Sequence, residues 1–258
     1  MNKKELCWLI TTECNQKCKY CDRFLKNKNL SNYDYIKIIN KLSSYGVPSI
    51  TLGGGEALLV NNINDIVRIA NEKNIKLKLV TNGLALMKKK DIIPNFDIIT
   101  LSIDCIDNDI NEYLGRGKEH YSNICNAIDY INSLEVKPEI HINSVANRYN
   151  LNLFINTAEF IKKYSIKHWR ILRFCPLRET AIKNKNKFEI TENEFKKLKA
   201  QIENLDLNTK VDFRNYNDME SQYLLISPDG MLCISDNLND KVIGNLLEDD
   251  LFSYFYEE

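Results

Sequence analysis

The stretch TTECNQKCKYC, residues 11–21, places three cysteines within eight positions near the start of the chain. Cys14, Cys18 and Cys21 are close enough in sequence to share one task. A structural zinc site needs four ligands, and no fourth cysteine or histidine lies just downstream of this stretch. Thiolates are also the usual protein ligands of iron–sulfur clusters. Three thiolates on a four-iron cluster leave one iron open for a small molecule, and we favour this interpretation.

The composition is that of an ordinary globular protein. The chain has 258 residues, of which 44% are hydrophobic, and 35 basic residues balance 35 acidic ones. This length suits one barrel-sized α/β domain or two small domains, and the balanced charge predicts no nucleic-acid or membrane partner. The apolar run 6–10 is too short for a signal peptide, and no segment could span a bilayer. We therefore expect a cytoplasmic protein whose clustered cysteines stay reduced and bind metal.

Short β-like runs alternate with helical patterns six times along the chain. This alternation predicts an α/β fold with a parallel sheet and right-handed crossovers. The expected strands are 5–12, 49–52, 75–80, 98–103, 139–145 and 169–174. The rest of the chain is expected to form a solvated loop over 183–187, a helix over 191–205 and a hairpin over 222–234.

Polar and glycine-rich residues recur where the predicted strands end. In parallel α/β sheets the carboxyl ends of the strands form the edge at which ligands bind. One such coincidence would mean little, whereas six in chain order predict a single site. The six groups are Glu13-Cys14, Gly53 to Glu56, Thr81 to Gly83, Ser102 with Asp104, Asn143-Ser144 and Arg173.

Residues 14–21, CNQKCKYC, are similar to the CxxxCxφC pattern of radical S-adenosylmethionine (SAM) enzymes, with Tyr20 as the aromatic residue. Gly54-Gly55-Glu56 resembles the GGE element of that family, and no Gly-Lys-Ser/Thr follows that would indicate a P-loop. The resemblance implies a partial (β/α)6 TIM-like barrel of parallel strands. Residues 1–180 would form this core, and residues 181–258 would form a helix-plus-hairpin extension packing over the active site.

The resemblance also implies the cofactors. Cys14, Cys18 and Cys21 would hold a [4Fe–4S] cluster whose open iron binds SAM, and Gly54, Gly55 and Glu56 would meet the SAM amino group. Reductive cleavage of SAM to a 5′-deoxyadenosyl radical would then remove a hydrogen atom from a small-molecule substrate. The implied protein partner is an electron donor such as a flavodoxin or ferredoxin.

Four further stretches resemble viperin and its microbial relatives, which dehydrate nucleoside triphosphates to 3′-deoxy-3′,4′-didehydro products. They are Leu114 to Gly117, His141 to Arg148 with Asn150, Trp169-Arg170, and residues 217–224. The resemblance implies a nucleoside triphosphate as substrate. It places Asn82, Ser102, Arg116 and Ser144 on SAM, and His141, Asn143, Arg170 and Arg173 on the substrate. Tyr223 would return a hydrogen atom to the substrate radical, or else pack as a core tyrosine of the hairpin.

The sequence departs from these relatives at several positions. His141 and His168 stand where the relatives have a lysine and an arginine, so two fixed positive charges become titratable ones. Residues 173–178, RFCPLR, have no counterpart that we can place. Two alternatives stay open: a radical SAM enzyme that modifies a peptide or another metabolite, with Cys233 left in a degenerate auxiliary-cluster region, and a zinc or iron–sulfur sensor protein.

Overall fold

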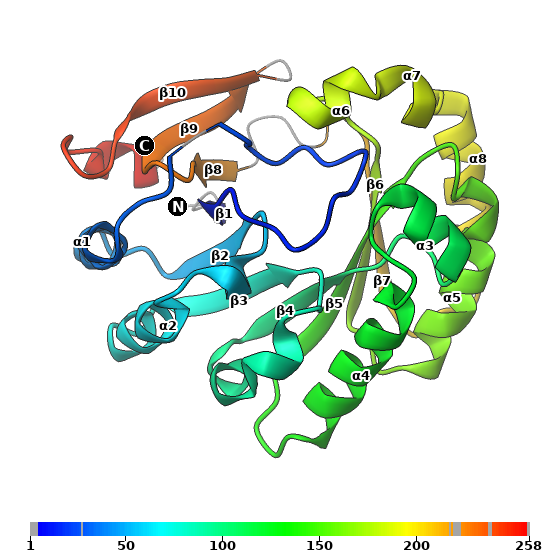
Figure 1. The fold of residues 1–258 in the computed structure, drawn as a ribbon, viewed down its shortest axis with the longest axis horizontal. Coiled ribbons are helices and arrows are strands. Elements are labelled where there is room, and N and C mark those ends of the chain that lie inside the picture. The colour runs from blue at the N-terminus through cyan, green and yellow to red at the C-terminus, as the bar shows by residue number, and fades with distance from the viewer. Residues whose placement is uncertain (1–4, 27, 217, 219–222, 237–238, 257–258) are drawn as a thin grey trace.

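A single curved sheet organises the molecule. The computed structural model describes residues 5–26, 28–216, 218, 223–236 and 239–256, and within them ten strands are hydrogen-bonded in the order β10-β9-β8-β1-β2-β3-β4-β5-β6-β7 (Figure 1). The strands are β1 Glu5–Thr11, β2 Ser49–Gly54, β3 Lys76–Thr81, β4 Ile98–Ser102, β5 Glu139–Ala146, β6 His168–Arg173, β7 Lys210–Arg214, β8 Tyr223–Ile226, β9 Met231–Asp236 and β10 Asn239–Asn245.

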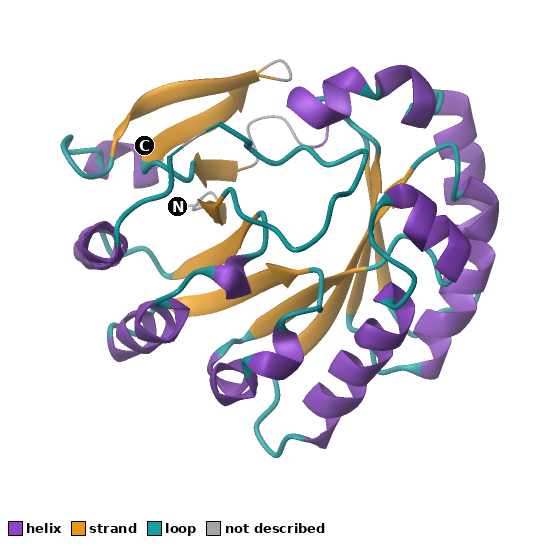
Figure 2. Ribbon diagram, in the orientation of Figure 1, coloured by secondary structure: helices purple, strands orange, loops and turns teal. Residues whose placement is uncertain are grey.

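The strands from β8 through β1 to β7 run parallel, and β9 and β10 are antiparallel additions at one edge. Helices cover the outer side of the curved sheet (Figure 2). No helix in the described part of the chain is both long and apolar enough to cross a membrane. The helices are α1 Asn32–Ser44, α2 Ile63–Glu72, α3 Asn108–Leu114, α4 His120–Ser133, α5 Phe154–Lys163, α6 Glu179–Lys183, α7 Lys185–Phe188 and α8 Glu192–Glu203.

This architecture confirms the expected α/β barrel-like fold and adds two strands to it. The sequence did not reveal β7 or β10, and the first strand of the predicted hairpin, β8, pairs with β1 rather than standing apart. Residues 183–187 were expected as a loop, and this expectation is wrong, because Lys183 ends α6 and residues 185–187 lie in α7, with Asn184 alone between them. Ala181 and Phe188 are buried there against Tyr20 and Phe174, which anchors both short helices.

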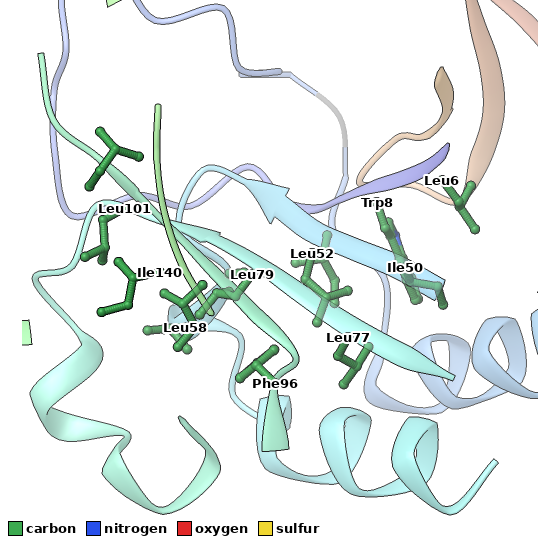
Figure 3. Packing of buried hydrophobic residues seen from close by; sticks show 14 of the residues in the cluster. Leu6, Trp8, Ile50, Leu52, Leu58, Leu77, Leu79, Phe96, Leu101 and Ile140 are labelled. Atoms are coloured by element: carbon green, nitrogen blue, oxygen red, sulfur yellow. The ribbon is translucent and has the colours of Figure 1, made fainter. Parts of the chain in front are cut away.

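Burial alternates along the strands because successive side chains point to opposite faces of a sheet. In β1, residues 6, 8 and 10 are buried, whereas residues 7 and 9 are half-buried and face the hollow side. The buried faces of the strands and the helices together form one hydrophobic core. Figure 3 shows part of that core, including Leu6, Trp8, Ile50, Leu52, Leu77, Leu79, Leu101 and Ile140.

The end of β2 lies directly against the chain that leaves β1. The Gly55 amide donates to the Thr11 carbonyl at 2.8 Å, and the Glu56 amide donates to the Glu13 carbonyl at 2.7 Å. A Cβ atom on Gly55 would lie 2.0 Å from the Glu13 carbonyl oxygen, and one on Gly54 would lie 2.7 Å from that of Thr11. The glycines therefore permit this backbone contact, which fixes where the cysteine-bearing segment starts.

Gly55→Ala should destabilise the protein by at least about 2 kcal/mol, because the clash is with backbone that cannot turn aside. Gly53→Ala is the matched control, since its Cβ would meet only side-chain carbons at 3.7 and 3.8 Å, which is ordinary contact. Thermal unfolding followed by circular dichroism measures both variants. Equal melting temperatures for the two would contradict the close approach of these segments.

Candidate functional site

The cysteine loop, defined as residues 12–30 between β1 and α1, is held at the carboxyl end of the sheet by the end of α3. The Lys17 amide donates to the Gly115 carbonyl at 3.1 Å, and the Lys19 amide donates to the Leu114 carbonyl at 3.0 Å. Gly115 has φ of 88°, and a Cβ there would lie 2.2 Å from the Lys17 carbonyl oxygen. Gly115 is therefore required for the loop to dock.

A buried ion pair lies beneath this contact. The Arg116 Nε donates to Asp104 Oδ2 at 2.5 Å and to the Tyr20 hydroxyl at 2.8 Å, and the Tyr20 hydroxyl itself donates to Asp104. Burial alone would lower the pKa of Arg116, but the Asp104 carboxylate outweighs this effect and holds the pKa well above its ordinary value. Arg116, expected on SAM, is thus fixed by Asp104 and Tyr20, a contact that sequence reasoning did not predict.

Gln16 connects this ion pair to the loop and to α4. Its side-chain amide donates to the Arg116 carbonyl at 2.9 Å, and its Oε1 accepts from Arg116 Nη1 at 3.1 Å. His120 Nε2 lies 2.9 Å from the Ser102 carbonyl, so that nitrogen carries the proton and Nδ1 accepts from Gln16 at 3.1 Å. Burial, assisted by the Arg116 charge, lowers the pKa of His120 to about 3, which keeps the ring neutral.

Asp104 is also held from the side of β5. The Val145 amide donates to Asp104 Oδ1 at 2.7 Å, and the Asn150 side chain donates to the Asp104 carbonyl at 3.0 Å. Asn150 and Asn147 are fully buried, and the Asn147 amide donates to Asn150 Oδ1 at 2.8 Å. The asparagines of the stretch 141–150 therefore shape the turn that supports Asp104.

The three thiols suit an iron–sulfur cluster chemically. Cys14 Sγ accepts from the Gln16 amide at 3.4 Å and from Asn82 Nδ2 at 3.7 Å. Burial raises the pKa of Cys18 and raises that of Cys21 to about 12, so a bound cation has to stabilise the thiolates. Among the described residues, no three Cys, His, Asp or Glu side chains already surround one point as metal ligands do. One anchored loop nevertheless carries all three thiols.

Two residues expected on SAM are instead turned into the protein. Glu56 is fully buried, accepts from the Thr81 hydroxyl and the Asn82 amide at 2.8 Å each, and has its pKa raised by that burial. Ser144 is fully buried as well; it donates to the Ile103 carbonyl and accepts from Trp169 Nε1 at 2.9 Å. These side chains shape the strand ends, whereas Asn82 lies beside Cys14 itself.

The hollow side of the sheet brings together the other expected residues. Ser102, Asn143, Arg170 and Asp212 are in register on β4 to β7, and paired residues of parallel strands point to the same face. The neighbouring row on that face contains His141 and His168. Ser102, predicted to contact SAM, and His141, Asn143 and Arg170, predicted to contact the substrate, thus lie on one face of the sheet.

These two rows contain two fixed cations, Arg170 and Lys210, the carboxylate of Asp212 and two titratable rings. Arg170 Nε is buried and has no hydrogen-bond acceptor among the residues that the structure describes. The rings of His141 and His168 lie 5.3 Å apart at a steep angle. Burial lowers the pKa of His141 and lowers that of His168 to about 4, so both rings are neutral at pH 7.

The structure places Arg173 on the other face of β6 from this group, whereas Tyr223 lies near enough to Arg214 of β7, which donates to Asp212, to act on it electrostatically. Arg173 lies on the other face of β6 from Arg170, where its guanidinium donates to the Ile190 carbonyl at 2.7 Å and to Asn215 at 3.1 Å. Tyr223 begins β8 and pairs with Glu5 of β1, which lies six residues, or roughly 20 Å along the strand, before Thr11. The other tail positions, 217 and 219–222, lie outside the described residues.

The chain is similar to known proteins in sequence and in fold. One relative is the S-adenosylmethionine-dependent nucleotide dehydratase of Flammeovirga pacifica, which is 28% identical over 91% of this chain and 83% of that protein. Another is the S-adenosylmethionine-dependent nucleotide dehydratase of Selenomonas ruminantium, which is 25% identical over 95% of this chain and 91% of that protein. The fold resembles the crystal structure of Streptococcus suis SuiB, with a TM-score of 0.76 and 18% identity over 99% of this chain, which spans 66% of SuiB.

A family model of the radical SAM superfamily matches residues 8–161, more than half of the 258-residue chain. That span contains the cysteine loop, the glycines of β2 and the ion pair of Arg116 with Asp104. The family works with a [4Fe–4S] cluster and SAM, which agrees with the thiol-only donor set of the loop. The chain therefore belongs to the radical SAM superfamily.

Proposed function

We propose that this radical SAM enzyme dehydrates a nucleoside triphosphate to a 3′-deoxy-3′,4′-didehydro nucleotide. The observation that carries the proposal is the row on the hollow side of the sheet, where Arg170 presents a buried, unmatched donor within the described structure. A guanidinium in such a position suits a phosphate oxygen. Relatives covered over most of their length are named nucleotide dehydratases, which supports the same substrate class.

The residues of the chain supply binding and orientation. When bound, the [4Fe–4S] cluster and SAM supply the reductive cleavage that starts hydrogen abstraction. Cys14, Cys18 and Cys21 would hold the cluster, and Asn82 donates toward Cys14. Arg170 would bind phosphate, while Asn143 beside it on β5 faces the same hollow. Because His141 and His168 are neutral at pH 7, Arg170 and Lys210, which pairs with His168, carry the positive charge of these two rows beside the carboxylate of Asp212.

We also propose that residues 181–258 work as an extension that closes over the core. Arg178 supports this, because its guanidinium donates to both carboxylate oxygens of Asp240 in β10, at 2.8 and 2.9 Å. The same guanidinium donates to the Asp22 carbonyl at 2.9 Å and lies 4.4 Å from the centre of the Phe24 ring. The unmatched stretch 173–178 thus joins the cysteine loop to the C-terminal hairpin.

Anaerobically reconstituted protein with SAM and a reductant tests the proposal directly. Mass spectrometry of reactions with CTP, UTP, GTP and ATP should find one nucleotide that loses one water while 5′-deoxyadenosine forms. Cys14→Ala should abolish both products, since the cluster loses a ligand. If none of the nucleotides stimulates SAM cleavage by the wild-type protein, the nucleotide substrate is wrong and a peptide or another metabolite takes its place.

Replacement of Arg170 separates substrate binding from SAM cleavage. Arg170→Gln should raise the KM for the nucleotide by at least about tenfold, because a hydrogen bond to a charged group contributes about 1.5–3 kcal/mol. Arg173→Gln, on the opposite face of the same strand, should leave that KM within about twofold. Steady-state kinetics at saturating SAM measures the nucleotide KM of both variants. A larger effect at Arg173 would contradict the assignment of the hollow side as the substrate site.

A further inference from the structure

Exposed basic side chains gather around the outer side of the cysteine loop. We call Lys17, Lys19, Arg148, Lys183 and Lys187 the basic rim, and all five are exposed. They come from the loop, from the turn after β5 and from α6 and α7. In Figure 1 the cysteine loop runs toward α3 and toward α6 and α7, which lie at the same side of the barrel.

Direct contacts hold these segments together. The Asn184 side chain, between α6 and α7, donates to the Lys19 carbonyl at 2.8 Å. Lys19 Nζ lies 4.1 Å from the centre of the Tyr113 ring, and the Tyr113 hydroxyl donates to that of Tyr149 at 2.9 Å. Lys187 and Arg148 lie near enough to Tyr149 to act electrostatically on its hydroxyl. The rim is therefore one surface rather than scattered charges.

The rim presents five basic side chains on a chain whose net charge is zero. Some surface lysines are paired, such as Lys196 with Glu192 at 2.7 Å and Lys162 with Glu159 at 3.1 Å. In the described residues, Lys17, Lys19, Lys183 and Lys187 have no carboxylate within ion-pair distance. Such a patch attracts an acidic partner and speeds its association.

We propose that the basic rim is the docking surface for an acidic one-electron carrier protein that holds a flavin or an iron–sulfur centre. The proposal rests on the function above, because the reaction needs one electron delivered at the cysteine loop. The carrier is oxidised by one electron, and that electron is consumed in breaking a carbon–sulfur bond of SAM. Electron transfer slows steeply with distance, and the rim borders the loop itself. Transient redox complexes use small interfaces that charge complementarity orients.

The test reverses charge on the rim at positions outside the cysteine loop. The double variant Lys183→Glu/Lys187→Glu is compared with Lys73→Glu/Lys137→Glu, two exposed lysines in the loops that precede β3 and β5, at the opposite edge of the sheet. Binding of an oxidised acidic flavodoxin is measured by flavin fluorescence at low ionic strength. The rim variant should bind at least about tenfold more weakly than wild type, and the control within about twofold.

Turnover provides the second readout. Formation of 5′-deoxyadenosine driven by reduced flavodoxin should fall with the binding, whereas formation driven by a photoreduced, uncharged deazaflavin should not change. Equal flavodoxin binding by wild type and the rim variant, or equal losses in both double variants, overturns the docking surface. Failure of the wild type to cleave SAM with deazaflavin would instead overturn the proposed function, and the binding measurement would still decide the docking proposal.

Discussion

The arrangement of the site depends on one buried ion pair. Arg116 and Asp104 lie in contact beneath the cysteine loop, and Tyr20 of the loop completes the group. Removing one partner of a buried pair typically costs about 3–5 kcal/mol, because the remaining charge has no counterion. Tyr20 also packs in the hydrophobic cluster with Phe174 and Phe188, so its ring and its hydroxyl both hold the loop. The pair fixes the loop before any cofactor is bound.

Three glycines also position the cysteine loop, and they lie on two sides of it. Gly54 and Gly55 let the end of β2 contact the start of the loop, and Gly115 lets the end of α3 contact its middle. The loop backbone therefore lies in contact with two other backbone segments, and a side chain in place of any of these glycines would displace the loop. The family's glycine-rich elements therefore have, in this chain, a demonstrable role in positioning the thiols, in addition to any role toward SAM.

The sequence predicted what depends on short spacing and missed what depends on the tertiary fold. The cysteine motif, the glycines and the first six strands follow from local patterns. Asp104 was not recognised as the partner of Arg116, because Tyr20, which joins them, is 84 residues away from Asp104 in sequence. Arg173 was grouped with Arg170 although three positions along a strand reverse the side-chain direction. The strand β7 was missed because its sequence, KVDFR, places charged residues on the hollow-facing side, and such a polar pattern is typical of a loop.

The most direct test of the account measures iron in Asp104→Asn. Asparagine keeps the shape and can still accept hydrogen bonds, but it leaves the Arg116 charge buried without a counterion. After anaerobic reconstitution, the wild type should hold about four irons per chain and show an electron paramagnetic resonance signal that changes when SAM is added. The Asp104→Asn variant, with its secondary structure verified by circular dichroism, should lose most of that iron. A full iron complement and an unchanged response to SAM in the variant would contradict the claim that this ion pair positions the cysteine loop.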